Sequence, residues 1–193
     1  MNITRNLVVA ILMTIVTTLL LGVVYPLVVT GIAQALFPAN ANGQLIQRDG
    51  KIVGSRIIGQ TFSSPGYFRG RPSAAGTGYD AANSGGTNLG PTNKKLIDAV
   101  KASVDAARME NTSALVPIDM VTSSASGLDP HVSPASAAFQ VARVARERGV
   151  SAVDVQHLVD VYTKGRQLGF LGEPVVNVLE LNLALDAQFP KKQ

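Results

Sequence analysis

The sequence predicts an α/β (mixed α+β) domain carried on a single N-terminal transmembrane helix. Three observations support this fold class. Positions 6–47 contain no Asp, Glu, Lys or Arg, and the first part of this uncharged segment is almost entirely apolar. Beyond them, apolar residues at helical spacing alternate with shorter stretches typical of strands. Residues 38–193 have the length of one ordinary domain, and the absence of cysteine leaves core packing to hold it together.

The first element is a membrane-spanning helix over residues 7–30, with an apolar continuation to about residue 37. The run LVVAILMTIVTTLLLGVV has only threonine hydroxyls as polar side-chain groups. A hydrocarbon core about 30 Å thick needs roughly 20 helical residues, which this stretch supplies. Threonines in such a helix can bond back to their own backbone or across to a neighbour.

Four small or helix-perturbing residues lie within this apolar segment. Gly22 with Pro26 predicts a kink. Gly31 and Ala35 form a small-xxx-small pair, which favours close packing against another helix. The alternative is a helix that simply sits in lipid.

A cleaved signal peptide is the competing interpretation of the N-terminus. Residues 33–35 and 39–41 both have the A-x-A form of a cleavage site. The apolar run, however, exceeds the usual 7–15 residues of a signal-peptide core, and it resumes after Tyr25 and Pro26. We therefore expect the segment to be retained as an anchor.

The orientation of the helix is predicted from the few flanking cations. Arg5 and the terminal amine flank one end, and no cation flanks the other end before Arg48. Because short cytoplasmic flanks attract Lys and Arg, residues 1–6 are expected in the cytoplasm and residues 38–193 outside it.

The charge of the chain does not indicate nucleic-acid binding. The formal net charge is +4, and leaving out Arg5 reduces it to +3, spread along the chain. With no Trp and few other aromatic residues there is no stacking platform. The largest cationic groups are Arg69/Arg71, Lys94/Lys95 and Arg143/Arg146/Arg148.

A hairpin and a long loop are expected next. Asp49-Gly50 between short apolar pairs predicts a type I′ turn, and Ile57-Ile58 predicts a further short strand. Residues 59–93 are crowded with Gly, Ser, Asn and Pro, yet they also hold several aromatic residues, which a disordered linker seldom does. We expect an ordered, irregular loop with a function.

The middle of the chain predicts one helix and one strand. Apolar residues recur every three or four positions over 93–109, which indicates a helix. The residues Val116, Ile118, Met120 and Thr122 alternate as in a strand, with Pro117 suggesting an edge or strand start.

Two helices and an ambiguous segment complete the domain. Ser133 and Pro134 are expected to open a helix that Gly149 closes. Ser151 resembles the start of a capping box and opens a second helix that runs until Gly165. The final segment, 175–185, suits either a strand or a helix.

The sequence shows no catalytic or metal-binding constellation. Residues 85–90 have the glycine spacing of a phosphate loop, but Pro91 stands where Lys is required. There is no G-x-S-x-G elbow or S-x-x-K nucleophile, and the two histidines lack zinc-site spacing. His131 is expected in a loop and His157 on a helix surface.

Serines and one aspartate are the remaining polar candidates. No base stands at recognisable spacing from Ser123, Ser124 or Ser126, so strand-end hydrogen bonding is their expected role. Asp129 before Pro130 indicates a turn.

Six segments together give the chain a family resemblance over essentially its whole length. They are VYPLVVTGIAQALFP, GYFRGRPSA, SGGTNLGPTN, VTSSASGLDPHVSP, QVARVARERGV and LGFLGEPVVNVLELNLALD. In this order they resemble the C subunit of the bacterial potassium-transporting ATPase, the KdpC family.

The resemblance implies a single-span accessory subunit in the bacterial plasma (inner) membrane, with an extracytoplasmic (periplasmic) domain. Its implied partners are a channel-like potassium-binding subunit, a P-type ATPase subunit and a very short membrane peptide. The implied activity of the complex is high-affinity potassium uptake driven by ATP. The chain itself would have no cofactor of its own and no catalytic residues.

Aromatic and arginine side chains of the long loop are the expected partner contacts, because such residues are enriched at interfaces. The candidates are Tyr67, Phe68, Arg69, Arg71 and Tyr79. The alternative for Tyr67 and Phe68 is that they pin the loop to the core.

The resemblance also implies a catalytic-chaperone role, in which the subunit raises the ATP affinity of the ATPase subunit. The candidate nucleotide contacts are Gln140 and the segment Ser84-Gly85-Gly86. ATP is cytoplasmic, whereas the predicted orientation places these residues outside. We expect Gln140 on a solvated polar helix face with Arg143 and Glu147, and an effect of the subunit through its transmembrane helix.

The rival function is a stand-alone membrane-anchored enzyme or solute-binding domain. An enzyme needs convergent acid, base or metal groups, which the sequence does not offer. A solute-binding module needs a pocket, on which the sequence is silent.

Overall fold

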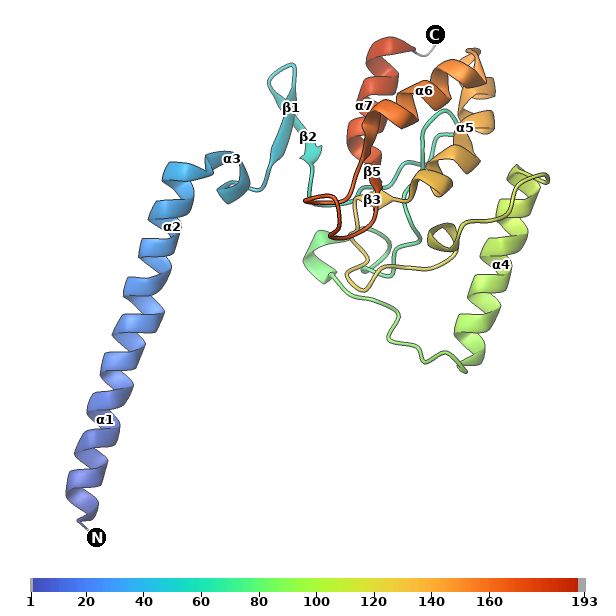
Figure 1. Ribbon diagram of the computed structural model, residues 1–193. Coiled ribbons are helices and arrows are strands. Elements are labelled where there is room, and N and C mark those ends of the chain that lie inside the picture. Colours follow the sequence, from blue (N-terminus) through green and yellow to red (C-terminus); the bar gives the residue numbers. More distant parts are fainter. Residues whose placement is uncertain (1, 191–193) are drawn as a thin grey trace. The chain divides into compact units, whose positions relative to one another are not determined.

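The computed structural model describes residues 2–190, and the chain divides into two compact units, 1–45 and 46–193. Figure 1 shows the helical N-terminal unit in blue and the mixed domain in the remaining colours.

The N-terminal unit is one continuous helix followed by a short turn of helix. It comprises α1 (Ile3–Leu19), the π-helical segment Leu20–Val24 and α2 (Tyr25–Leu36). The whole helix, Ile3–Leu36, has 34 residues, and its most apolar 18-residue window has a mean hydropathy of 2.8 and no buried residue, so the helix is long and apolar enough to cross a membrane. The short helix α3 (Pro38–Ala41) comes next.

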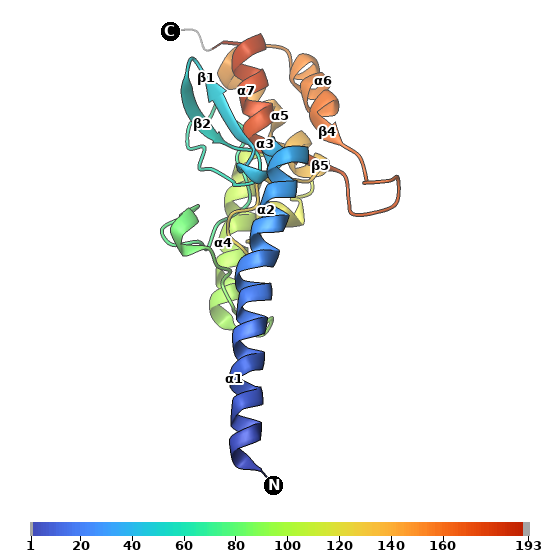
Figure 2. The ribbon, with the colours of Figure 1, turned by 90° about the vertical axis from the view of Figure 1, so that its left-hand side faces the viewer.

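The kink predicted at Gly22 and Pro26 does not form as a sharp bend (Figures 1 and 2), and the segment just before Pro26 is instead a π-helical turn. Pro26 has no N–H to donate to the preceding turn, and the ladder widens over Leu20–Val24, immediately before it. Figures 1 and 2 show the helix continuing through this point without a sharp bend. Thr14 and Thr17 donate to the carbonyl oxygens of Ala10 and Met13, at 2.8 and 2.7 Å.

The hairpin of the second unit forms as the sequence predicts. Strand β1 (Leu45–Arg48) pairs with β2 (Lys51–Ser55). Asp49 and Gly50 both have positive φ, 52° and 73°, as a type I′ turn requires. The strand expected at Ile57-Ile58 is wrong, because the chain turns there and the Ile57 N–H donates to Ser55 Oγ at 3.3 Å.

A small antiparallel sheet is covered by three helices in the C-terminal half. Strand β5 (Val175–Asn177) lies between β3 (His131–Val132) and β4 (Thr163–Lys164). Helices α5 (Pro134–Arg148), α6 (Ala152–Tyr162) and α7 (Val178–Gln188) pack with the sheet. The core residues buried at this junction include Phe68, Val132, Val144, Val155, Val159, Val176, Leu181 and Leu185.

The predicted helix boundaries of α5 are confirmed by its caps. Ser133 Oγ accepts from the Ser136 N–H at 3.0 Å, and Gly149 ends the helix at a φ of 67°. Helix α6 is capped by Ser151, but it ends at Tyr162 rather than at Gly165, because Thr163 and Lys164 pair with β5.

The ambiguous segment 175–185 contains both structures. It is a strand to Asn177 and a helix from Val178, and Asn177 Oδ1 accepts from the Glu180 N–H at 3.0 Å. The apolar alternation therefore belongs to β5, and the helical spacing belongs to α7.

The middle region contains one confirmed helix and one wrong strand. Helix α4 (Lys94–Glu110) begins after Asn93, whose side chain accepts from the Lys95 N–H, and Figure 1 shows it at the edge of the domain. The alternating residues 116–122 instead form a 3-10 turn over Ile118–Met120. A second 3-10 turn covers Ala81–Asn83 in the long loop.

Candidate functional site

The long loop 59–93 is fixed to two helices by an amide clamp, which we define as Asn182 of α7 and Gln140 of α5. Asn182 accepts from the Phe68 N–H at 2.9 Å and donates to the Phe68 carbonyl oxygen at 2.8 Å. Gln140 does the same for Arg69, at 2.8 and 3.1 Å. Each side-chain amide therefore satisfies both backbone groups of a loop residue, as a neighbouring strand would.

The clamp corrects the prediction for Gln140. Its side chain is only 1% exposed, so it does not lie on a solvated polar face. The neighbouring turn faces inward as well, because Arg143 is 6% exposed, while Glu147 alone of the three is exposed. The prediction is wrong because a polar helix face that binds a buried loop has the same sequence pattern as a polar face exposed to solvent.

Arg143 joins the clamp to the end of α4. Its Nε lies 2.7 Å from Glu110 Oε1, and its Nη2 donates to Gln140 Oε1 at 2.8 Å. Its Nη1 donates to the carbonyl oxygens of Pro65 and Tyr67. Glu110 also lies 3.6 Å from Arg69. One buried guanidinium thus connects α5, α4 and the loop.

Arg148 holds the loop one turn further along α5. Its guanidinium lies 4.7 Å from the ring centroid of Tyr67, and its Nη1 lies 2.8 Å from Asp186 Oδ1. Tyr67 donates its hydroxyl to Asp186 Oδ2 at 2.9 Å. Burial and the neighbouring Asp186 carboxylate together raise the pKa of Tyr67 above its ordinary value.

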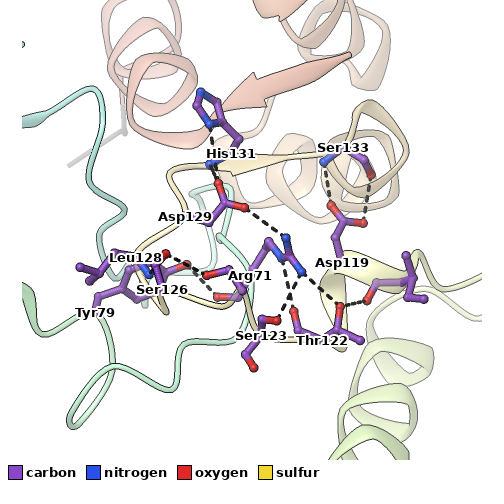
Figure 3. Close-up of polar contacts among 12 residues, drawn as sticks. Arg71, Tyr79, Asp119, Thr122, Ser123, Ser126, Leu128, Asp129, His131 and Ser133 are labelled. Atoms are coloured by element: carbon purple, nitrogen blue, oxygen red, sulfur yellow. Dashed lines mark hydrogen bonds and ion pairs between the residues drawn. The ribbon is translucent and has the colours of Figure 1, made fainter. Parts of the chain in front are cut away.

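A second polar cluster, shown in Figure 3, joins the loop to the start of β3. Arg71 Nη1 lies 3.1 Å from Asp129 Oδ2, and the His131 N–H donates to Asp129 Oδ1 at 3.0 Å. His131 lies in β3 rather than in a loop, and its Nδ1 is 3.6 Å from Asp129. Burial alone would raise the pKa of Asp129, but hydrogen bonds from His131 and Arg71 outweigh it and lower that pKa.

Tyr79 closes this cluster from within the loop. Its hydroxyl donates to the Arg71 carbonyl oxygen at 2.7 Å. Burial and the nearby Asp129 carboxylate raise the pKa of Tyr79 to about 12. Glycine is required at position 59, where a Cβ would lie 2.5 Å from Tyr79 Cε1, and Gly70 is crowded by the same ring.

A cavity of about 360 Å³ opens beside the cluster. Its polar lining includes Arg71, Asp119, Asp129, His131 and Glu173, and its apolar lining includes Pro117, Ile118, Val132, Pro174 and Val175. Figure 3 shows Asp119 engaged with Ser133, whose N–H and hydroxyl donate to it at 2.7 and 3.0 Å. Across residues 2–190 there is no group of three or more His, Asp or Glu side chains placed to hold a metal ion.

The segment Ser84-Gly85-Gly86 contacts the serine-rich stretch before β3. Ser84 Oγ and the Gly85 N–H both donate to the Ser126 carbonyl oxygen, at 3.0 and 2.9 Å. Ser126 Oγ in turn accepts from the Leu128 N–H at 3.1 Å, within an irregular segment and not at the end of the strand expected over 116–122, which does not form. These polar groups are thus used within the fold, and a nucleotide contact stays a prediction.

The partner-contact candidates divide into buried and accessible side chains. Phe68 is 0% exposed, so its side chain belongs to the core. The expectation that Phe68 contacts a partner at the surface is therefore wrong. Tyr67, Arg71 and Tyr79 are partly buried, and Arg69 is the most exposed of the five. Their role toward partners stays a prediction. His157 lies exposed on α6, as expected.

Comparison with known proteins gives one consistent result. The model of the family described as "KdpC: K+-transporting ATPase, c chain" matches residues 7–187. A potassium-transporting ATPase KdpC subunit of Koribacter versatilis is 63% identical over 186 residues, covering 96% of this chain and 96% of that protein. The protein of the same name from Methylococcus capsulatus is 58% identical, covering 92% of this chain and 95% of its own length. A family match over nearly the whole chain, supported by full-length relatives of such identity, shows that the chain belongs to the KdpC family of potassium-transporting ATPase subunits.

Proposed function

We propose that this chain is a non-catalytic accessory subunit of an ATP-driven, high-affinity potassium uptake complex. Its partners in this proposal are a channel-like potassium-binding subunit, a P-type ATPase subunit and a small membrane peptide. The subunit contributes to assembly and potassium transport by binding these partners, and it supplies no reacting group. Family membership is the observation that carries the proposal.

The use of polar side chains within the domain supports a binding role. Gln140, Arg143 and Arg148 would be prominent candidates for a catalytic or nucleotide site, yet each holds the backbone of the loop 59–93. Asp129 and His131 contact each other beside Arg71. The domain therefore uses these groups to present a fixed surface, which suits a partner-binding subunit better than a turnover site.

We assign the N-terminus to the cytoplasm and the domain to the extracytoplasmic side, in the bacterial plasma membrane. The cations support this orientation, because Arg5 lies in the first turn of the apolar helix, whereas no cation follows the helix before Arg48. In this orientation the domain does not meet cytoplasmic ATP.

The effect on ATP affinity is accordingly proposed to act at a distance. Gln140 and Ser84 are both occupied by contacts within the fold. A coupling through the transmembrane helix needs only that the subunit bind two states of the ATPase subunit with different affinity. The nucleotide then contacts the ATPase subunit and not this chain.

The test is potassium-stimulated ATP hydrolysis by the purified complex with and without this chain, titrated in potassium and in ATP. We expect loss of the chain to abolish high-affinity potassium stimulation and to raise the apparent KM for ATP. A stable monomer in mild detergent with a turnover of its own, and no co-elution with membrane partners, would contradict the proposal and favour a stand-alone enzyme or solute-binding domain.

A further inference from the structure

The connection between β4 and β5 ends in an exposed apolar tip, which we define as Leu168, Phe170 and Leu171. Their exposed fractions are 83%, 69% and 47%. Single exposed apolar residues are ordinary on a protein surface, but three within four positions of one protruding turn are not explained by packing. Figure 2 shows this connection extending away from the helices of the domain.

The tip is a closed turn with its own hydrogen bonds. Gln167 and Leu171 exchange two backbone hydrogen bonds, both 2.9 Å long, and the Phe170 N–H donates to the Gln167 carbonyl oxygen at 3.2 Å. The three apolar side chains are therefore presented on a defined backbone. A surface ordered in advance binds with a smaller loss of conformational entropy.

Leu168 occupies a backbone conformation that does not suit leucine. Its φ is +52°, and that of Gly169 is +82°. Two successive residues of positive φ form the turn that Asn-Gly adopts most readily, since Asn tolerates the left-handed region better than a branched apolar residue. The chain thus keeps leucine where folding favours asparagine, and where the side chain makes little contact with the rest of the protein.

The cations beside the tip are already paired. Arg166 lies 2.7 Å from Glu173, and Lys164 lies 2.6 Å from Glu180. A loop that binds the membrane surface combines apolar residues with cations available to anionic lipid. Here the charges neutralise each other around the base of the turn, which matches the apolar centre and polar rim of a protein interface.

We infer that the 168–171 tip is a docking knob that enters an apolar pocket on the extracytoplasmic surface of a membrane partner subunit. The inference rests on the proposed function, which supplies the complex, and it adds which surface binds and what chemistry receives it. A compact aromatic and aliphatic anchor in a pocket is the usual form of an interface hot spot.

The test uses the full chain co-expressed with its partner subunits and purified in mild detergent through a tag on the ATPase subunit. Leu168→Asn removes the apolar side chain and relieves the backbone, so it should keep or raise the unfolding midpoint. We expect it to reduce retention of the chain on dilution at least about tenfold, as for a hot-spot truncation. Phe170→Ser should do the same. The matched control is Leu115→Asn, since Leu115 is 95% exposed elsewhere in the domain, and it should be retained like the wild type.

The outcomes separate this inference from the proposed function. If the wild-type chain does not co-purify with partner subunits, the proposed function fails, and the inference fails with it. If the wild type co-purifies and both tip variants are retained equally, only the inference is overturned. An equal loss for Leu115→Asn would also overturn it, because the effect would then follow from exposed leucine in general.

A fluorescent probe distinguishes a protein pocket from lipid. The chain has no cysteine, so Gln167→Cys, beside the tip, gives this chain a single site for an environment-sensitive label and leaves Leu168, Phe170 and Leu171 in place. A blue shift that needs the partner subunits and resists quenching by nitroxide lipids supports the docking knob. A blue shift in vesicles containing this chain alone, quenched by those lipids, would overturn it in favour of membrane contact.

Discussion

Asn182 and Phe68 stand 114 positions apart in the sequence, and the Asn182 amide holds both the N–H and the carbonyl oxygen of Phe68, at 2.9 and 2.8 Å. This pairing places an aromatic side chain of an irregular loop in the core of the domain, where Phe68 is fully buried. The backbone N–H and carbonyl oxygen of Phe68 are therefore both hydrogen-bonded, as in a strand, although the loop belongs to no sheet.

Asn182→Ala should destabilise the domain, because it leaves both backbone groups of Phe68 buried without partners. Each such group costs about 1–3 kcal/mol. We expect a lower urea midpoint for unfolding of the full-length chain in detergent. The measurement is protease cleavage within the 59–93 loop as a function of urea concentration. Gln188→Ala, at the exposed end of the same helix, is the control and should leave the midpoint unchanged. Equal midpoints for the two variants would mean that the clamp contributes nothing.

Gln140→Ala should lower stability without altering the ATP site. Gln140 is buried against Arg69 and Arg143, so its loss unpairs the loop and not a nucleotide. We expect ATP hydrolysis by assembled complex to stay within about tenfold of wild type, less than the loss of a general acid or base. The measurement is the apparent KM for ATP at saturating potassium. A strong rise in that KM, with assembly and potassium dependence intact, would support direct nucleotide contact instead.

The Asp129 carboxylate predicts a loss of stability in acid. The pKa of Asp129 in the folded protein lies below the usual 3.8. The ionised carboxylate therefore stabilises the fold above about pH 4, and this stabilisation is lost as the pH falls through the lowered pKa. We expect the difference in unfolding free energy between wild type and Asp129→Asn to narrow over this range. Asp98→Asn, with a mostly exposed side chain, is the control and should give a small gap at every pH. If the difference in unfolding free energy between wild type and Asp129→Asn stays constant from neutral pH into acid, the lowered pKa of Asp129 is contradicted.

Gly31→Leu tests whether the transmembrane helix packs against a partner. A Cβ at Gly31 would meet nothing within 4 Å in this chain, so the substitution leaves the chain itself undisturbed. If the Gly31/Ala35 pair is a packing face, the larger side chain should deplete this subunit from the purified complex. Val29→Leu, about 160° around the helix, should have no such effect. Complete assembly of Gly31→Leu would show that this face meets only lipid.

Single cysteines test the orientation of the chain. Lys101 is exposed on α4, and Lys101→Cys should react with a membrane-impermeant thiol reagent in intact cells. Asn2→Cys should stay protected until the membrane is permeabilised. The opposite pattern would place the domain in the cytoplasm. N-terminal sequencing supplies a further check, because a mature chain beginning after Ala35 or Ala41 would show a cleaved signal.

Local signals in the sequence predicted the elements that depend on local chemistry. Asp49-Gly50 predicted the hairpin turn, and Ser133 with Gly149 predicted both ends of α5. The wrong strand at 116–122 shows the limit of periodicity. Alternating apolar residues indicate a strand only where another strand is available to pair with them, and here Asp119 instead binds the start of α5.

The site was harder to predict because its contacts join residues far apart in the chain. The aromatic content of the loop correctly indicated an ordered segment, but nothing near Phe68 or Arg69 identifies Asn182 and Gln140 as their partners. Glu110 and Asp186 were likewise missed, since an acidic residue on a helix ordinarily lies in solvent. The double contact of an amide with one residue's backbone leaves no pattern in a single sequence.

The position of Asn182 near the end of the chain also sets an order of events during biosynthesis. The loop 59–93 emerges from the ribosome long before Asn182, the residue to which it must be hydrogen-bonded. Until α7 has been made, Phe68 has no place in a finished core, and the loop stays open to proteases and chaperones. Native pairing over such a separation is slow to form, since the intervening chain must first be closed into a large ring. The synthesis of α7 thus decides when the loop that precedes it in the sequence can take its folded position.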